Sequence, residues 1–562
     1  MTIYYVRETA LGSGNGSSYE NSMSAKSHNE DRTFVGGDVI YLCDKISAKL
    51  AIPSSGDEGN EIIYRGDYAG HHALLRITTS SGMLRGEYKS NIIVDSVECF
   101  KGKIGIAFIN GNHNITIKRC TVHEMLGNGA KGIMFSKNTE ARNSNIVVGG
   151  APGDGNHVYN CGQDTGGNDI VTANCDGVLI SYNDCHGGNA DTGIDGYADM
   201  GSTDGIVEYN WFYNHIKSTN DAEAEYGENG VDLKGSSDYI VRYNHIFGNR
   251  ATGFNLNRQY SFEGAPVCKN IRAYGNYIHD NGQSNVTLKY VDHTVYFYNN
   301  LIVNSGKSHG LVGADKGVDI WIYNNTFVNN YTELGDRQRY ALIIGGGNNY
   351  HVKNNIFYSD THQKLIWNGS AVKDVVFDNN LYHSGGGETL FYWHEQFRTL
   401  REIKALGQET HGIEANPLLT DINNDDYTLL SDSPCIGSGA NLGTEYEFGL
   451  APMTDFSLVP PSIYLVNRNV YGNWDIGAFQ YLGDVDPCED VVCPTVCIDN
   501  DIWSQRCDPT TGLCVADQLL LKDATTCMNK VPTDESTIQK YLVLGGLGLA
   551  GFAMLLMSRN KK

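Results

Sequence analysis

The chain has 562 residues, more than one ordinary hydrophobic core organises, so the sequence predicts several domains or one elongated repeat. Its formal net charge of −23, without any long basic stretch, argues against a nucleic-acid partner and suits an extracellular or cation-holding protein. Gly and Tyr are abundant, at 65 and 34 residues, and few segments show a helical apolar period, so we expect little helix.

The first residues, MTIYYVRETALG, lack the basic and long apolar regions of a secretory signal peptide. If the protein is exported, then either a longer gene product or another route, such as that of a virion protein, has to account for its translocation.

A short motif, Asn followed by any residue and an apolar one, recurs through the middle of the chain. The motif asparagines are Asn183, Asn210, Asn244, Asn276, Asn300, Asn325, Asn355 and Asn380. Their gaps of 24 to 34 residues, filled by short alternating strands, are typical of a solenoid. The leucine-rich consensus is missing, and helical repeats need helices that this chain lacks.

The repeat predicts a parallel β-coil of about three strands per turn, with turns ~4.8 Å apart. Asn suits a bend between strands because it tolerates the left-handed backbone conformation. Its amide can also bond to the Asn one coil above and form a ladder. Inward columns of Ile, Val, Leu and Phe would make the core, and the variable gaps predict protruding loops.

These Asn-capped coils resemble the right-handed parallel β-helix proteins of the pectin-lyase-like superfamily. YYVRETALGSGNGSSYENSMS followed by GGDVIYLC resembles the N-terminal cap of that group, and ANPLLTDINNDDYTLLSDSPCIGSGAN and WDIGAFQY resemble its C-terminal coils. The resemblance implies an all-β parallel β-helix over residues 1–482, in a group where many members have no known activity. One amphipathic helix is expected near 395–406, and the oligomeric state stays open, with a homotrimer as one candidate.

Five stretches align on a small residue followed by an apolar one: GIMFS (132–136), GIDGY (193–197), GVDLK (230–234), GFNLN (253–257) and NVTLK (285–289). Strand alternation then sends the second residue of each inward and the third and fifth outward. The outward residues are Met134, Asp195, Asp232, Asn255 and Thr287, and then Ser136, Tyr197, Lys234, Asn257 and Lys289. The alignment therefore predicts Asp195 directly beside Asp232, with Lys234 on the same strand.

Carboxylates stacked one coil apart repel each other unless a cation lies between them. Ca²⁺ accepts about six to eight oxygen ligands in flexible geometry. The predicted ligands are Asp195 and Asp232, with Glu223, Glu225 and Glu228 from the preceding loop NDAEAEYGEN. The alternative is a solvated acidic face on an already acidic protein.

Lys234 has two interpretations. It is a candidate base for β-elimination from a uronic-acid polysaccharide, provided that burial or a cation such as Ca²⁺ lowers its pKa. Arg258 would then meet the leaving oxygen or the substrate carboxylate, and the predicted sugar-binding residues are Asn255, Asn257, Lys289 and Tyr197. Alternatively, Lys234 only neutralises Asp232 or Asp195 on a solvated face.

GENGVDLKGSSDYIVRYN also resembles the calcium-dependent, lysine-base lyases of this superfamily. Lys234 matches their base, and Arg258 loosely matches an Arg that follows one coil later. The stretch departs from the pattern because Asn229 stands where an acidic ligand is wanted, with Glu228 one position away. The GHG, WIDH and DPHD motifs of polygalacturonases, pectate lyases and mannuronan epimerases are absent.

Six cysteines crowd into residues 483–530. They are Cys488, Cys493, Cys497, Cys507, Cys514 and Cys527. Their number and irregular spacing predict a disulfide-stapled stalk module in an oxidising, extracytoplasmic setting, with a zinc site as the alternative.

Residues 541–557, YLVLGGLGLAGFAMLLM, form an uncharged apolar run of 17 residues after a linker at 531–540. The run predicts a membrane-spanning helix with the basic tail at 558–562 in the cytoplasm, and the alternative is a buried core helix.

Two functional hypotheses remain open. In the first, a membrane-anchored surface β-helix binds an acidic polysaccharide or cell-surface glycan and cleaves it by β-elimination. In the second, the chain is a non-catalytic surface or virion spike whose coils present adhesive loops. The acid-rich loop before Lys234 favours the first, and the missing signal peptide favours the second.

Overall fold

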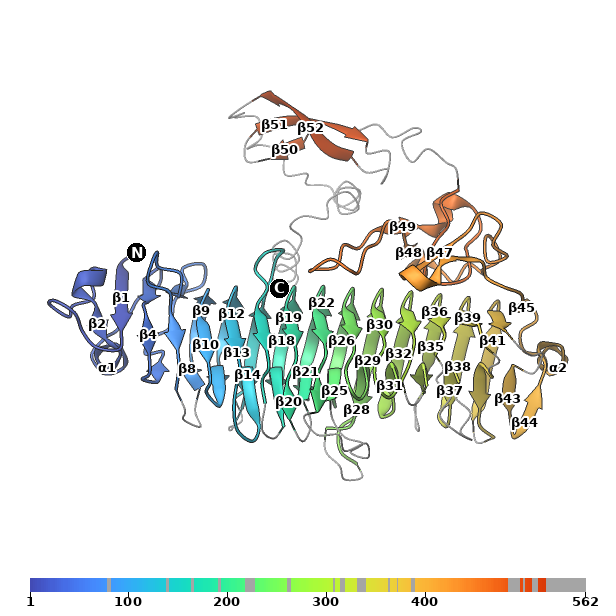
Figure 1. Cartoon of the computed structure of the whole chain (residues 1–562), viewed down its shortest axis with the longest axis horizontal. Coiled ribbons are helices and arrows are strands. Elements are labelled where there is room, and N and C mark those ends of the chain that lie inside the picture. Colours follow the sequence, from blue (N-terminus) through green and yellow to red (C-terminus); the bar gives the residue numbers. More distant parts are fainter. Residues whose placement is uncertain are drawn as a thin grey trace, which may run out of the picture.

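Three long parallel sheets, wound around one core, make up most of the molecule (Figure 1). The computed structural model describes residues 1–77, 82–137, 141–162, 166–190, 194–217, 228–259, 264–306, 309–313, 319–330, 340–361, 364–370, 372–385, 390–483, 496–498, 501–507 and 514–521. Neighbouring strands in each sheet come from successive turns of chain, as a parallel β-helix requires. The predicted solenoid is therefore confirmed.

Sheet I has 15 strands in all. Two of them lie at the N-terminal end, and each of the others comes from one successive coil. In spatial order they are β2 (Met23–Ser24), β1 (Ile3–Arg7), β3 (Val39–Leu42), β6 (Ile62–Arg65), β9 (Ser90–Asp95), β12 (His113–Lys118), β15 (Asn143–Val148), β18 (Cys175–Ser181), β22 (Thr203–Glu208), β26 (Ser237–Arg242), β29 (Cys268–Tyr274), β32 (Val291–Tyr298), β35 (Ile320–Tyr323), β38 (Asn348–Lys353) and β41 (Lys373–Asp378).

Sheet II has 14 short strands. They are β4 (Lys45–Ile46), β7 (Leu74–Leu75), β10 (Glu98–Phe100), β13 (Thr121–His123), β16 (His157–Tyr159), β19 (Asp184–His186), β23 (Trp211–Tyr213), β27 (His245–Phe247), β30 (Tyr277–His279), β33 (Leu301–Val303), β36 (Thr326–Val328), β39 (Ile356–Ser359), β42 (Leu381–Ser384) and β45 (Ile413–Glu414).

Sheet III, also of 14 strands, carries the stretches aligned from the sequence. Its strands are β5 (Leu50–Ala51), β8 (Gly82–Glu87), β11 (Ile104–Ile109), β14 (Ala130–Ser136), β17 (Gly167–Ala173), β21 (Ile194–Met200), β25 (Glu228–Lys234), β28 (Phe254–Asn257), β31 (Val286–Leu288), β34 (Leu311–Val312), β37 (Leu342–Ile344), β40 (Ile366–Asn368), β43 (Phe391–Trp393) and β44 (Gln396–Arg398), the last pair being antiparallel.

Small elements complete the described residues. The helices are α1 (Ala25–Glu30) and α2 (Leu400–Ala405), with single turns η1 (Tyr19–Asn21), η2 (Ile422–Asn424), η3 (Thr444–Tyr446) and η4 (Arg468–Tyr471). The remaining strand pairs are β20 (Asn189–Ala190) with β24 (Ile216–Lys217), β46 (Leu419–Asp421) with β47 (Asp426–Leu429), and β48 (Phe448–Leu450) with β49 (Leu465–Asn467). The helix predicted at 395–406 is shorter than expected, because Thr399 and Glu402 form a capping box that begins it at Leu400.

The predicted asparagine ladder is present and runs along the core. Each side-chain Nδ2 donates to Oδ1 of the next coil's asparagine at 2.9–3.0 Å, from Asn156 through to Asn380. The Nδ2 of Asn380 donates at 2.6 Å to Oε1 of the buried Glu409, which ends the row. Each coil is thus tied to the next through a fully buried amide.

The predicted reason for asparagine at these positions was wrong in one respect. The eight predicted asparagines do not adopt positive φ; the residue before each of these eight does. These preceding residues are Tyr182, Tyr209, Tyr243, Gly275, Asn299, Asn324, Asn354 and Asn379. The ladder asparagines are therefore placed by their buried amide hydrogen bonds, and the left-handed bend falls one residue earlier.

A C-terminal segment lies along the outside of the coils, drawn in orange in Figure 1. Its loop reaches back to β23, where Trp211 Nε1 donates to the carbonyl oxygen of Leu458 at 3.0 Å. Tyr427, Phe456 and Phe479 of this segment pack with Tyr277 of β30 in a second hydrophobic cluster. The segment thus covers part of the outer side of sheet II.

Residues 496–521 contain a small antiparallel sheet of β50 (Val496–Ile498), β51 (Asp501–Cys507) and β52 (Cys514–Leu521), in which Cys507 and Cys514 are register partners. The predicted linker, membrane span and tail at 531–562 lie outside the described residues, as do Cys488, Cys493 and Cys527. Within the described part of the chain, no helix has both the length and the apolar character to cross a membrane. The eight cysteines between Cys43 and Cys435 are free and buried.

Candidate functional site

A row of polar side chains crosses five neighbouring strands of sheet III, and we call it the polar patch. Its members are Lys131, Asn168, Asp195, Asn229, Asp232, Lys234 and Asn255. They come from β14, β17, β21, β25 and β28, which are adjacent in the sheet. Register pairing sets Lys131, Asn168, Asp195 and Asn229 in one column, and Asp232 beside Asn255 in another. The fold therefore gathers groups that are up to 124 residues apart in sequence, from 131 to 255.

Lys234 and Asp232 form the centre of the polar patch. The Lys234 Nζ lies 2.7 Å from Asp232 Oδ2 and 3.8 Å from Asp195 Oδ2. The two carboxylates are almost fully buried, while the lysine side chain keeps 29% of its surface exposed. The predicted proximity of Asp195, Asp232 and Lys234 is confirmed, and Lys234 reaches the solvent.

Amide groups surround the two carboxylates. Asn255 Nδ2 donates to Asp232 Oδ1 at 3.0 Å. Asn229 Nδ2 donates to Asp195 Oδ1 at 3.0 Å and lies 3.3 Å from Asp232 Oδ2, and Asn168 Nδ2 donates to Asp195 Oδ2 at 3.0 Å. Every carboxylate oxygen of the pair thus accepts at least one hydrogen bond, which lets both acids stay buried.

The predicted register of the two aspartates was wrong. In the structure Asp232 pairs with Ala198, and Asp195 pairs with Asn229. Asp195 and Asp232 therefore lie diagonally across the strands, and not side by side as predicted.

The same shift moves Tyr197 from the surface to the core. It was predicted to face outward and bind sugar, but it pairs with Val231 and has no exposed surface. Its hydroxyl lies 2.7 Å from Thr172 Oγ1 and 3.3 Å from the hydroxyl of Tyr239, so its polar end is satisfied inside. Tyr197 is not a substrate-binding residue.

The carboxylates around Lys234 argue against its acting as a general base. Burial lowers its pKa, but the Asp232 and Asp195 carboxylates more than offset burial, so that the net pKa is raised. Burial and the neighbouring Asp195 in turn raise the pKa of Asp232 to about 6 against the opposing effect of Lys234. Lys234 therefore holds its proton at neutral pH and acts as a fixed positive charge.

Lys131 has the opposite environment. Burial lowers its pKa to about 8, with Lys234 adding to the effect and Asp195 opposing it. Its Nζ donates to Asn168 Oδ1. At pH 7 about a tenth of Lys131 is deprotonated, far more than of an ordinary lysine, which makes it the better candidate for a base in the polar patch.

The Ca²⁺ prediction stays a prediction, because the described residues include only part of its expected ligand set. The Lys234 ammonium lies between the two carboxylates, where a bridging cation was predicted, and amide donors occupy the other carboxylate oxygens. The described residues thus do not present the set of about six free oxygens that Ca²⁺ takes. Glu223 and Glu225 lie outside the described residues, so their part in the Ca²⁺ prediction stays a prediction.

The other predicted site residues lie around the polar patch. Asn257 is the register partner of Lys234, and its Oδ1 accepts from the backbone N–H of Arg258 at 2.9 Å. The Arg258 guanidinium carbon lies 4.6 Å from the ring centre of Tyr290, over which the Lys289 ammonium also lies at 5.5 Å. Glu228 is buried, with its Oε2 3.9 Å from Nη1 of Arg250.

Sequence reasoning missed Lys131, Asn168 and Asn229. Lys131 directly precedes one of the aligned stretches, and Asn229 was noted only as a departure from a metal-ligand pattern. A signal was available, because each lies directly before a glycine or aspartate near the start of an apolar stretch, in KGIMF, NDIV and NGVDL. That position forms its own column on sheet III.

Comparisons with known proteins do not assign the chain to a family. No protein-family model matches the chain, and no curated protein matches it. Among solved structures, it is similar to a pectate lyase (14% identity, TM-score 0.41, 85% of this chain and 96% of that one). It is also similar to the A-module of a mannuronan C-5 epimerase of Azotobacter vinelandii (15%, 0.42, 68% and 92%). A third is a lacto-N-biosidase of Eubacterium ramulus (15%, 0.39, 66% and 65%). At these identities the likeness concerns the fold alone, which is the parallel β-helix described above.

Proposed function

We propose that the chain binds an acidic polysaccharide along the outer face of sheet III and cleaves it by β-elimination at the polar patch. The observation that carries the proposal is the polar patch itself: two lysines and two buried aspartates held by three amides on adjacent coils. Because the coils stack ~4.8 Å apart, the patch extends along the axis and suits an extended chain of sugars.

The two lysines take different roles in this mechanism. Lys234 keeps its charge and would pair with a substrate carboxylate, stabilising the negative charge that develops when the neighbouring carbon loses its proton. Lys131 would take that proton. The C–O bond to the leaving sugar then breaks, the electron pair forms a carbon–carbon double bond, and the leaving oxygen is protonated from solvent.

This assignment revises the prediction that Lys234 is the base. A base needs a pKa close to the working pH, and burial gives this to Lys131, whereas two carboxylates raise the pKa of Lys234. Asn255 would hold Asp232 in place, and Asn257 and Arg258 on β28 and after it remain proposed sugar contacts. The Ca²⁺ requirement, the membrane anchor at 541–557 and the extracytoplasmic location also remain proposals from the sequence.

A panel of uronate polymers incubated with the full chain tests the proposal. Binding is measured by calorimetry, and cleavage by the ultraviolet absorbance of the unsaturated product. We expect Lys131→Met to abolish cleavage with binding retained, and Lys234→Met to weaken both. Lys269→Met, on sheet I, is the matched control and should behave as wild type. Parallel reactions with Ca²⁺ and with EDTA test the metal.

Three outcomes would replace this proposal. Cleavage that is unchanged in Lys131→Met and lost in Lys234→Met would return the role of base to Lys234. Cleavage that yields reducing ends without unsaturation would favour hydrolysis by the aspartate pair, which the raised pKa of Asp232 beside Asp195 supports as a second candidate. Failure to bind any polymer in the panel would favour the non-catalytic surface or virion spike.

A further inference from the structure

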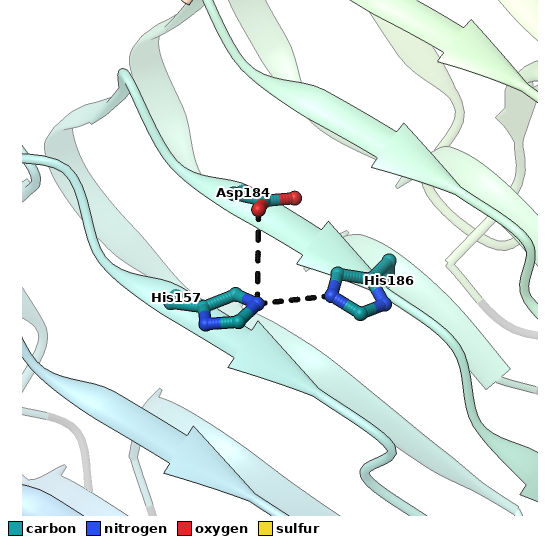
Figure 2. Close-up of side chains that lie close together, drawn as sticks. All are labelled: His157, Asp184 and His186. Carbon is teal, nitrogen blue, oxygen red and sulfur yellow. Dashed lines mark hydrogen bonds and ion pairs between the residues drawn. The ribbon is translucent and has the colours of Figure 1, made fainter. Parts of the chain in front are cut away.

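Two histidines and an aspartate converge on neighbouring strands of sheet II (Figure 2). His157 opens β16, and Asp184 and His186 lie on β19, the next strand of the sheet. Asp184 is the register partner of His157, and His186 stands two residues further along the same strand. Strand alternation therefore sends all three side chains to the same face.

The donor atoms of the three residues are close enough to share one ion. One atom from each residue lies within 4.8 Å of the other two. The His157 Nε2 is 2.9 Å from His186 Nε2 and 3.7 Å from Asp184 Oδ2. Two nitrogens bound to one Zn²⁺ at about 2.0–2.1 Å are about 2.9–3.4 Å apart for angles of about 90–110°, so the two rings need almost no movement.

Stacked rings hold His186 in this position. Its ring stacks on Tyr159 at 5.3 Å on one side and on Tyr213 at 4.8 Å on the other. His157 packs against Tyr159 at 4.4 Å. The ligands are thus oriented before any ion arrives, which reduces the entropy lost on binding.

The exposure of the side chains also suits a metal ion. The side chains of His157 and Asp184 are 44% and 28% exposed. An ion could enter from solvent and satisfy the carboxylate.

We propose that His157, Asp184 and His186 bind a divalent transition-metal ion, for which Zn²⁺ is the probe. Two imidazoles and one carboxylate are ligands that Zn²⁺ accepts, and three protein ligands leave a fourth position for water or an incoming oxygen. The site ties β16 to β19 across two coils. It does not depend on the polar patch of sheet III.

The same sheet contains a natural comparison. His245 on β27 and His279 on β30 occupy equivalent positions, with their Nε2 atoms 2.7 Å apart. The residue that stands where Asp184 would be is Tyr277, which carries no carboxylate. The Phe456 ring of the C-terminal segment also lies 6.4 Å from the ring of His245. This second pair has two imidazoles but lacks the third ligand, so it should not hold Zn²⁺ tightly.

Zinc titration of the full chain by calorimetry, with bound metal counted after dialysis, tests the proposal. We expect His186→Gln and His157→Gln each to remove one equivalent of Zn²⁺. Asp184→Asn, which keeps the shape of the side chain, should weaken that equivalent by at least about tenfold. His279→Gln is the matched control and should retain wild-type stoichiometry and affinity.

Co²⁺ substitution separates this site from the cysteines of residues 488–527. A site of histidine and carboxylate gives visible bands without thiolate charge transfer, and those bands should vanish in His186→Gln. Circular dichroism of each variant confirms that the sheets remain. Equal Zn²⁺ stoichiometry and affinity in wild type, His157→Gln and His186→Gln would overturn the proposal, as would an equal loss in His279→Gln.

Discussion

Single residues on sheet III owe their chemistry to their neighbours. Lys131 and Lys234 are the same residue type on the same face, yet burial lowers the pKa of Lys131 and a carboxylate pair raises that of Lys234. The sequence could place a lysine near two aspartates. It could not show for which lysine burial would outweigh the attraction of the nearby carboxylates. That difference depends on the burial and spacing of side chains from separate coils.

The lowered pKa of Lys131 predicts a pH profile for cleavage. If neutral Lys131 is the base, then kcat/KM should rise as pH increases through about 8 and level off above it, because the neutral fraction grows there. A pH–rate series on wild type measures this. In Lys131→Arg, whose guanidinium stays charged, activity should be low and the rise near pH 8 should be lost. A rise that persists in this variant would contradict the assignment.

The ladder residue Asn244 shows what one buried amide contributes. It donates to Asn276 and Val207 and accepts from Asn210, so alanine would remove hydrogen bonds to both neighbouring coils and leave the buried backbone N–H of Asn210 without its acceptor. We expect Asn244→Ala to cost about 1–3 kcal/mol per unpaired group in the free energy of unfolding. Denaturant unfolding measures the loss. Asn423→Ala, at an exposed position, should change stability by less than about 0.5 kcal/mol.

At the scale of the strand, the position of a glycine decided whether the prediction was right. The alignment of GVDLK, GFNLN and NVTLK was correct, because Val231, Phe254 and Val286 form one inward column. For β21 the stretch TGIDGYADM offers two glycines, and the prediction used Gly193 where the structure uses Gly196. The correct choice sends Tyr197 into the core, which an apolar pattern does not suggest.

Buried polar groups explain why the correct alignment of β21 was not evident from the sequence. Tyr197 and Asp199 both point inward on β21, and Thr172 on β17 meets them both, with its Oγ1 2.7 Å from the Tyr197 hydroxyl and 2.5 Å from Asp199 Oδ1. A polar network that is satisfied across coils is as acceptable inside as an apolar column. Sequence reasoning on one strand at a time cannot see its partners.

Arg468 anchors the C-terminal segment to the coil. It is fully buried, and its guanidinium donates to the carbonyl oxygens of Asp475, Gly477 and Ala478 and to Asn299 Oδ1 of the coil. We expect Arg468→Met to free residues 448–481 from the coil while the three sheets stay intact.

Hydrogen exchange read by mass spectrometry distinguishes the two parts. Protection should fall in peptides from 448–481 and remain in those from β29 and β32. Arg401→Met, on an exposed face of α2, serves as the control. A uniform loss of protection along the chain would show that the segment and the coil unfold together.

The whole molecule is elongated, as the sequence period indicated (Figure 1). Sheet I alone contains 15 stacked strands, which at ~4.8 Å per step gives an axis of about 70 Å. Small-angle scattering of the full chain should therefore give the distance distribution of a rod, and a compact, symmetric distribution would contradict this. Light scattering in the same sample tests the predicted homotrimer, whose mass would be three times 61.7 kDa.

The repeat period, the asparagine ladder and the fold class could be predicted because the same motif recurs in many coils. Each recurrence supports the interpretation of the others. The polar patch and the histidine–aspartate cluster occur once each. They lie on outer faces, where the repeat does not predict which residue type stands at each position. His157 and His186 came together only through the pairing of β16 with β19. The sequence therefore predicts the scaffold well and single sites only where alignment happens to be correct.

The carboxylate at the end of the asparagine row has a consequence for self-association. A stack of similar turns has no built-in length, since any exposed last turn offers unpaired edges to another molecule. Here Glu409 accepts from Asn380, and when ionised it has no hydrogen to donate, so the row of donated hydrogen bonds ends at this residue. The antiparallel β44 and the small helix α2, which buries Leu400 and Ile403, follow at the same end. We therefore expect this end of the coil to resist end-to-end polymerisation into fibres.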